Sequence, residues 1–137
     1  MGKEMGIRHF RELIVWKKAM ELVTEVYRIT ARFPESEKFG LVTQLRRAAV
    51  SVPSNIAEGQ GRSSTGEFKQ FLGHARGSLC EVDTQIEIAV NLGLLTQENA
   101  RRFETLIGDV ARLLNALIRS LADRTAARED DAFDTYE

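Results

Sequence analysis

Cysteine is nearly absent from this chain of 137 residues, and the long apolar runs that mark membrane proteins are missing. The single cysteine, Cys80, has no partner for an internal disulfide, which favours a reduced thiol in a cytoplasmic protein. No stretch approaches the roughly 18 uncharged apolar residues that a membrane span needs. Residues 1–10 carry charges without the apolar run of a signal peptide. We therefore expect a cytoplasmic protein with no membrane partner.

Residues suited to catalysis or metal binding are also scarce. The two histidines, His9 and His74, lack the glutamate three positions earlier that a carboxylate-bridged metal centre in a helical bundle uses. His74 and Cys80 would lie on different faces of a helix, which does not suit a nucleophile and its base. The sequence has neither a Gly-x-Ser-x-Gly turn nor a phosphate-binding glycine loop. We therefore predict no enzyme activity, no cofactor and no metal site.

Neither sign of charge dominates the chain. The sequence holds 19 Lys and Arg residues against 20 Asp and Glu residues. Residues 1–123 carry 17 basic and 15 acidic side chains, whereas residues 124–137 carry 2 and 5. A body so close to neutral lacks the strong positive potential typical of a dedicated nucleic-acid-binding protein.

Apolar residues recur at helical spacing through most of the chain. The first row predicts a helix over residues 10–33, which ends at Pro34 because proline disfavours the helical conformation in the residue before it. A second row continues through Pro53, whose missing N–H should kink the helix, and residues 59–61 should end it. The two rows are Val15, Ala19, Leu22, Val26, Ile29 and Phe33, then Leu41, Leu45, Ala48, Val52 and Ile56.

Two further rows predict two more helices. Ser64 and Thr96 are their expected N-caps, and Gly93 is the expected C-terminal cap of the first of them. Gly73 and Gly77 lie four positions apart, which suggests that another helix backbone approaches closely there. The rows are Phe68, Leu72, Ala75, Leu79, Val82, Ile86 and Ala89, then Phe103, Ile107, Val110, Leu114, Leu117 and Leu121.

Four long helices with short connections predict an all-α protein, an up-down-up-down antiparallel four-helix bundle whose second helix is kinked at Pro53. We assign residues 1–123 to this domain. The apolar periodicity stops after Ala122, so residues 124–137 are predicted to form an acidic tail without stable structure.

The first helix carries a second apolar row beside the one expected to face the core. Two adjacent rows make an apolar face wider than the core of one bundle needs. The second row either completes a broad core-facing side or packs against another subunit. Its members are Leu13, Trp16, Met20, Val23 and Tyr27.

Polar residues border the predicted core on the second and third helices. Asn55 and Glu58 lie three positions apart, and Ser78, Glu81 and Gln85 occupy successive turns. These groups suit either a small polar site that holds a ligand or an interhelical hydrogen-bond network that fixes helix register. We favour the network, because bundles often contain one and no pattern here specifies a ligand.

Three basic doublets are the candidate contacts to nucleic acid. Each doublet alone suits a solvated helix face, but copies arrayed around a symmetric ring would add up to a binding surface. The doublets are Lys17-Lys18, Arg46-Arg47 and Arg101-Arg102.

The most specific stretch, Val52-Pro53-Ser54-Asn55-Ile56-Ala57-Glu58-Gly59, resembles a motif of a bacterial four-helix bundle family. That family includes proteins encoded in intervening sequences of 23S rRNA genes, some of them labelled S23 ribosomal proteins. The accessory variability determinant of diversity-generating retroelements looks like a relative. The likeness covers residues 10–121 and includes Phe10 to Ala19, Ala49 to Arg62, Glu67, Phe71, Leu72, Ala75, Gly77, Ser78 and Glu81.

The resemblance implies a homo-oligomer, with a pentameric ring favoured, and a loose association with RNA or reverse-transcription machinery. It also implies that four residues matching the motif define the fold rather than catalyse a reaction: Asn55, Glu58, Ser78 and Glu81. Our leading hypothesis is a cytoplasmic, oligomeric binding or scaffold module. The alternative is an RNA- or DNA-binding accessory factor that uses the basic doublets. A ligand site or an enzyme that uses Asn55, Glu58 and Glu81 is a third hypothesis.

Overall fold

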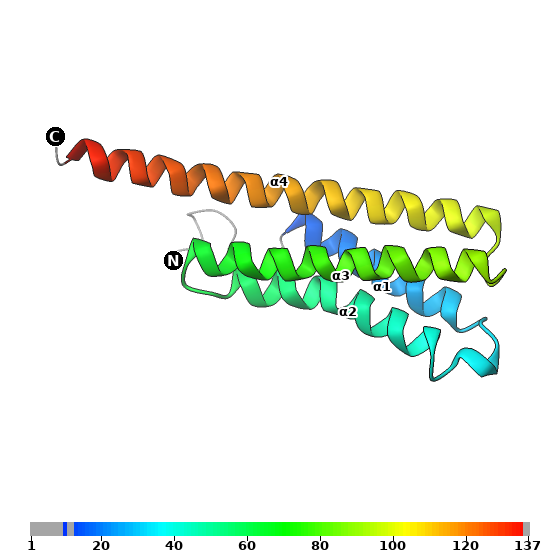
Figure 1. The fold of residues 1–137 in the computed structure, drawn as a ribbon. Helices are drawn as coiled ribbons and strands as arrows, with labels where there is room; N and C mark the ends of the chain where they lie inside the picture. Colours follow the sequence, from blue (N-terminus) through cyan, green and yellow to red (C-terminus); the bar gives the residue numbers. More distant parts are fainter. Residues whose placement is uncertain (1–9, 11–12, 136–137) are drawn as a thin grey trace.

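The computed structural model describes residues 10 and 13–135. Within these residues the regular structure is entirely helical, which confirms the predicted all-α class (Figure 1). Each of the first three α-helices packs on the next, and the fourth also packs on the first. The elements are α1 (Ile14–Thr30), the short 3-10 helix η3 (Glu35–Glu37), α2 (Leu41–Gln60), α3 (Thr65–Asn91) and α4 (Gln97–Thr135).

The core consists of the apolar rows that the sequence predicts, because one face of each helix loses its contact with water when the four helices pack together. Nearly every member of the four rows is buried; Phe68 and Leu117 are half-buried against the others. Five of the largest fully buried side chains come from all four α-helices: Leu22, Leu45, Ile56, Leu72 and Leu114.

α3 begins and ends, and α4 begins, at the capping residues that the sequence predicts. The hydroxyl of Ser64 accepts a hydrogen bond of 3.1 Å from the Glu67 N–H, and the hydroxyl of Thr96 accepts one of 3.1 Å from the Asn99 N–H. Gly93 has a φ of 73°, a left-handed conformation that glycine adopts without a steric penalty. Its N–H bonds to the Val90 carbonyl, which ends α3 in a Schellman-type turn.

The first helix is shorter than predicted. α1 ends at Thr30, and the N–H of Phe33 bonds to the Thr30 carbonyl three residues back, so the chain tightens before Pro34. α2 starts at Leu41, whose N–H is capped at 3.2 Å by the carboxylate of Glu37. A carboxylate at this end of a helix is favourable because the first N–H groups have no backbone partner.

Gly59 lies in the last turn of α2, which ends within residues 59–61 as predicted: Gln60 is its last residue and Gly61 its C-cap. Gly59 is also buried on the side of α2 that packs on α3. A Cβ atom at position 59 would lie 2.6 Å from the Cβ of Phe71 and 3.1 Å from the Cδ1 of Phe68. Glycine is therefore required at position 59 by packing against α3.

The predicted close helix contact at Gly73 and Gly77 is wrong within this chain. Nothing lies within 4 Å of a Cβ atom built at either position, and Gly77 is exposed. The small residues at which α2 and α3 touch are instead Gly59 and Ser51 on α2 and Ser78 on α3.

α4 does not end at Ala122, where the apolar periodicity stops. It continues to Thr135, so the predicted unstructured tail is helical up to that residue. Figure 1 shows this last part of α4, coloured red, extending past the N-terminal end of α3. The physical reason is local: no glycine or proline follows Gly108, and alanine, arginine and glutamate in the segment favour a helix without a row that faces the core.

Candidate functional site

The polar residues predicted to fix helix register are only partly brought together. The Ser78 hydroxyl donates to the Ser51 hydroxyl at 2.8 Å, which links α3 to α2. The Asn55 amide donates to the same hydroxyl at 2.9 Å and to the Ser51 carbonyl at 2.8 Å. Asn55 and Ser78 thus share Ser51, a residue that the sequence analysis missed as the link. The sequence feature that could have identified Ser51 is its position one helical turn before Asn55, on the same face of α2.

Glu58 lies outside this network. Its carboxylate pairs at 2.8 Å with Arg62, four residues later and just after the end of α2. The Arg62 guanidinium in turn lies 4.6 Å from the ring centre of Phe71 on α3. Glu58 therefore holds a surface arginine over an aromatic ring, where a cation is attracted by the π-electrons.

Glu81 lines a groove of about 370 Å³ between α2 and α3. The small residues Ala48, Ser51 and Ser78 form its more buried part. Gln44 and Arg47 on α2, and Glu81 and Gln85 on α3, line the rest. The side-chain oxygen of Gln85 is buried and has no hydrogen-bond partner within the described residues.

The second apolar row of α1 divides into buried and exposed members. Leu13 is 4% exposed and belongs to the core of this chain, so it is not available to another subunit. Trp16 and Val23 pack against the core, and the Trp16 ring meets the Phe10 ring edge-on at 5.3 Å. Met20 and Tyr27 are 39% and 43% exposed. Of the predicted interface residues, only these last two present large apolar surface to solvent.

Tyr27 also has a role within the chain. The Arg46 guanidinium lies 4.5 Å from the centre of its ring and donates to the Thr30 hydroxyl at 2.9 Å. A further bond of 3.3 Å reaches the Tyr27 carbonyl. Arg46 therefore joins α2 to the end of α1 and is not a free contact for nucleic acid. Thr30, a buried polar residue that the sequence analysis did not single out, is its anchor.

The other basic doublets are split by the fold. Lys17 and Arg102 line a groove of about 510 Å³ between α1 and α4, together with Met20 and Leu106. Arg102 is paired at 3.0 Å with Glu25, which also pairs with Arg28. Two of the cations in the groove thus share one carboxylate, and the three side chains together keep a net charge of +1.

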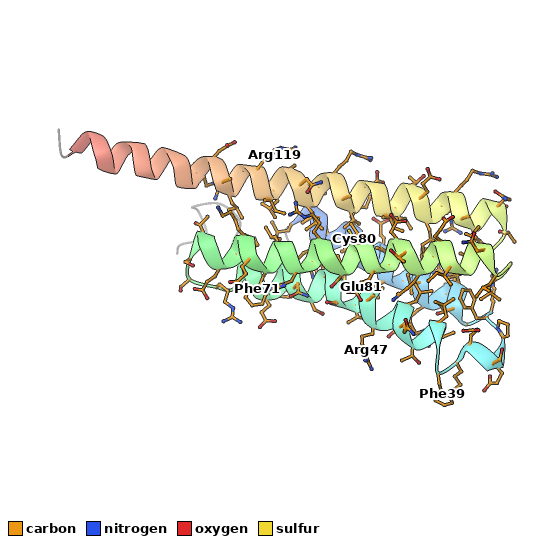
Figure 2. All side chains as sticks on the ribbon, in the orientation of Figure 1. Phe39, Arg47, Phe71, Cys80, Glu81 and Arg119 are labelled. Atoms are coloured by element: carbon orange, nitrogen blue, oxygen red, sulfur yellow. The ribbon has the colours of Figure 1, made fainter. Side chains whose placement is uncertain are left out.

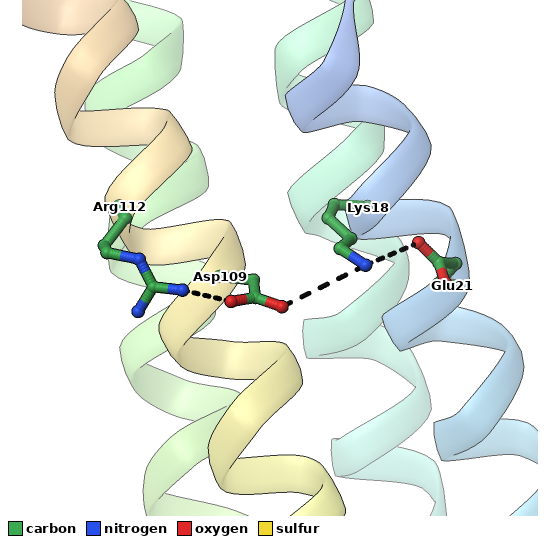
Figure 3. A network of polar contacts seen from close by, with 4 residues as sticks. All are labelled: Lys18, Glu21, Asp109 and Arg112. Atoms are coloured by element: carbon green, nitrogen blue, oxygen red, sulfur yellow. Dashed lines mark hydrogen bonds and ion pairs between the residues drawn. The ribbon is translucent and has the colours of Figure 1, made fainter.

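Lys18 belongs to a chain of surface ion pairs between α1 and α4 (Figure 3). Its ammonium group lies 3.2 Å from the Glu21 carboxylate and 4.0 Å from that of Asp109, which also pairs with Arg112. Exposed pairs of this kind contribute about 0–1 kcal/mol each. Of the six residues in the doublets, Lys17, Arg47 and Arg101 make no ion pair within the described residues.

Other exposed apolar residues lie near the end of the bundle where α2 begins and α3 ends. Phe39, next to the start of α2, is 89% exposed, and Figure 2 shows its side chain projecting from that end of the molecule. Ile88 and Leu92, one turn apart at the end of α3, are 43% and 59% exposed. Cys80, for which the sequence predicts a reduced thiol, is a free cysteine exposed on α3.

The described residues contain no cluster of three or more histidine, cysteine, aspartate or glutamate side chains that could hold a metal ion. None of the described helices is both long enough and apolar enough to cross a membrane.

Comparison with known proteins places this fold in a family. The chain is similar to a crystal structure of a protein of unknown function from the S23 ribosomal protein family of Bacteroides thetaiotaomicron. The TM-score is 0.69 at 21% sequence identity, over 77% of this chain and 98% of that one, a likeness that shows the fold alone. No curated protein matches the sequence. Residues 11–116 match the family description 23S rRNA-intervening sequence protein, which confirms the resemblance seen in the motif. The chain belongs to the family of 23S rRNA-intervening sequence proteins.

Proposed function

We propose that the protein is a homo-oligomeric helical bundle, with a pentamer favoured, that acts in the cytoplasm as a non-enzymatic binding or scaffold module. The observation that carries this proposal is the exposed apolar surface of α1. Ile14, Met20 and Tyr27 are 68%, 39% and 43% exposed, and Met20 lies in the groove beside Leu106 of α4. An apolar centre with a charged rim is typical of a protein interface.

The proposed bundle has up-down-up-down antiparallel order, with α2 kinked at Pro53. The order is supported by the short connections and by the packing of each helix on the next. The kink is supported by the position of Pro53 inside α2, because proline has no N–H for the carbonyl four residues earlier and its ring presses against that carbonyl.

The interface is tested by placing a charge on it. Met20→Glu should shift the protein to smaller species in sedimentation velocity at micromolar concentration, because a carboxylate resists burial against an apolar partner surface. Val50→Glu is the matched control, since Val50 on α2 is also 39% exposed. Val50→Glu should leave the distribution unchanged. Identical distributions for Met20→Glu and the wild-type protein would refute an interface at this surface.

The alternative function is binding of RNA through the basic residues that remain unpaired. Lys17 and Arg101, with Arg47 on α2, are exposed and make no ion pair within the described part of the chain. If they bind phosphate, fluorescence anisotropy with a structured RNA should show binding that weakens steeply with salt, and Lys17→Ala should lower the slope of that dependence. An absence of binding at low salt would contradict this function.

A further inference from the structure

The end of α4 extends beyond the other described helices. Leu121 belongs to the buried core, whereas Ala122, Asp123 and Arg124 are exposed. Residues 122–135, the C-terminal arm, continue as helix past the N-terminal end of α3, and no other described helix runs alongside its last turns (Figure 1). An isolated helix of fewer than about 15 residues is marginally stable in water. A surface that covers the arm would therefore stabilise it.

The sequence of the arm indicates which kind of surface would cover it. The arm holds 2 basic and 5 acidic residues, a net charge of −3. Ala126 and Phe133 lie seven positions apart, which places them on one face of the helix. A basic surface with exposed apolar groups matches both properties. The arm does not reach such a surface on its own chain, because α4 is one continuous helix that carries it away from the bundle.

Two neighbouring grooves along α1 and α4 form a surface with these properties, the α1–α4 surface. The groove of about 510 Å³ contains the exposed Met20 beside Leu106, and a groove of about 670 Å³ farther along α4 contains Leu113. The adjacent residues Lys17 and Lys18 line one groove each. Apolar groups are thus present in both grooves.

The charge of the α1–α4 surface is opposite to that of the arm. Its six basic side chains outnumber three acidic ones, Glu21, Glu25 and Asp109, which leaves a net charge of +3. Two of the cations, Lys17 and Arg119, make no ion pair within the described residues. The basic side chains are Lys17, Lys18, Arg28, Arg102, Arg112 and Arg119.

We propose that the C-terminal arm of one copy of this chain lies along the α1–α4 surface of a second copy, an inference that rests on the proposed homo-oligomer. At about 1.5 Å per residue the arm is about 21 Å long, and the 17 residues of α1 span about 26 Å, so the arm fits within the length of α1. The arm and the surface are different parts of the chain, so the contact is head-to-tail. Contacts of this type close into rings.

The α1–α4 surface suits the arm better than it suits a nucleic acid. A phosphate backbone carries a negative charge at every nucleotide and would meet Glu21, Glu25 and Asp109 among the cations. It would also leave Met20 without an apolar partner. The arm carries fewer charges and has an apolar face that can cover Met20.

Exchange of charges in the full chain tests the contact. Asp130→Lys with Asp131→Lys reverses the charge of the arm, and Arg112→Glu with Arg119→Glu reverses that of the α1–α4 surface. Each pair should lower the association constant by at least about tenfold in sedimentation velocity at micromolar concentration, because like charges then face each other. All four substitutions in one chain should restore the wild-type distribution. Lysine near the C-terminal end of a helix is favourable, so the arm pair does not weaken the helix itself.

The matched control is Asp83→Lys with Glu87→Lys on α3. Both residues are exposed and lie outside the two grooves, and the pair changes the charge of the chain as much as the arm pair does. This control should leave the distribution of species unchanged, and circular dichroism should show every variant to be helical.

The outcomes separate this inference from the proposed function. A wild-type protein that is monomeric would overturn both. An oligomeric wild type overturns the inference alone if the arm pair leaves the distribution unchanged, if the control weakens association equally, or if the fourfold variant does not recover. It is also overturned if the surface pair abolishes binding of a structured RNA and leaves assembly intact.

Discussion

Replacement of Gly59 by alanine should destabilise the bundle, although alanine is the better helix former. The new Cβ atom would lie 2.6 Å from the Cβ of Phe71, about 0.8 Å short of the 3.4 Å at which ordinary contact begins. The Phe71 Cβ is attached directly to the backbone of α3, so only a shift of one helix against the other relieves the clash. Overpacking of this kind costs about 1–3 kcal/mol. A clash that only a helix shift relieves belongs to the upper part of that range, about 2–3 kcal/mol, and alanine recovers about 1 kcal/mol of helix propensity, which leaves a net loss of about 1–2 kcal/mol.

The matched control is the same substitution at Gly77 on α3. Position 77 lies inside a helix, is exposed and has open space around its Cβ position. Gly77→Ala should therefore raise the free energy of unfolding by about 0.5–1 kcal/mol through the backbone entropy of the unfolded chain. The two substitutions are chemically identical, so their opposite signs isolate the effect of packing.

Urea denaturation followed by circular dichroism measures both effects at one fixed protein concentration, because association would otherwise change the apparent stability. A Gly59→Ala protein as stable as the wild type, or more stable, would refute the close approach of α2 and α3 at this point. A loss at Gly77 equal to that at Gly59 would refute the assignment of Gly77 to open space.

Four other substitutions and one control test separate parts of the bundle by the same denaturation assay. Leu114→Ala and Leu79→Ala should each cost about 2–5 kcal/mol, since both side chains are buried, and losses below about 0.5 kcal/mol at both would contradict the core register. Ser51→Ala should cost about 1–2 kcal/mol because it removes the acceptor shared by two side chains, whereas Ser54→Ala, exposed on the next turn, should be near neutral. Ser64→Ala should cost about 1 kcal/mol, and an unchanged midpoint would show that its N-cap bond to α3 contributes nothing.

The helices and their core-facing residues could be predicted because burial of one helix face requires apolar residues at every third or fourth position, and that spacing is visible in the sequence. Leu72, Ala75, Leu79 and Val82 follow the 3-4 spacing and are all buried in α3. Caps were equally predictable, since Ser64 and Gly93 act through their own local backbone. These features need no knowledge of which helix packs on which.

Features that depend on contacts between two helices could not be predicted from the spacing of residues along one helix. A glycine is equally suited to a helix end, a close contact or an open face, and only the position of α3 decides that Gly59 is the contact and Gly77 the open face. Leu13 lay on the row assigned to an interface, but the bundle buries it in the core. The partners of Arg46 and Arg102 come from other helices, so the doublets could not show which cations stay unpaired.

The measurement that tests the proposed function most directly is the mass of the wild-type protein by light scattering across micromolar concentrations. A homo-oligomeric scaffold predicts a stable mass that is a multiple of the 15.4 kDa chain, with five copies favoured. A constant mass of one chain over the whole range would contradict the account, because the exposed apolar surface of α1 would then have no second copy to cover it.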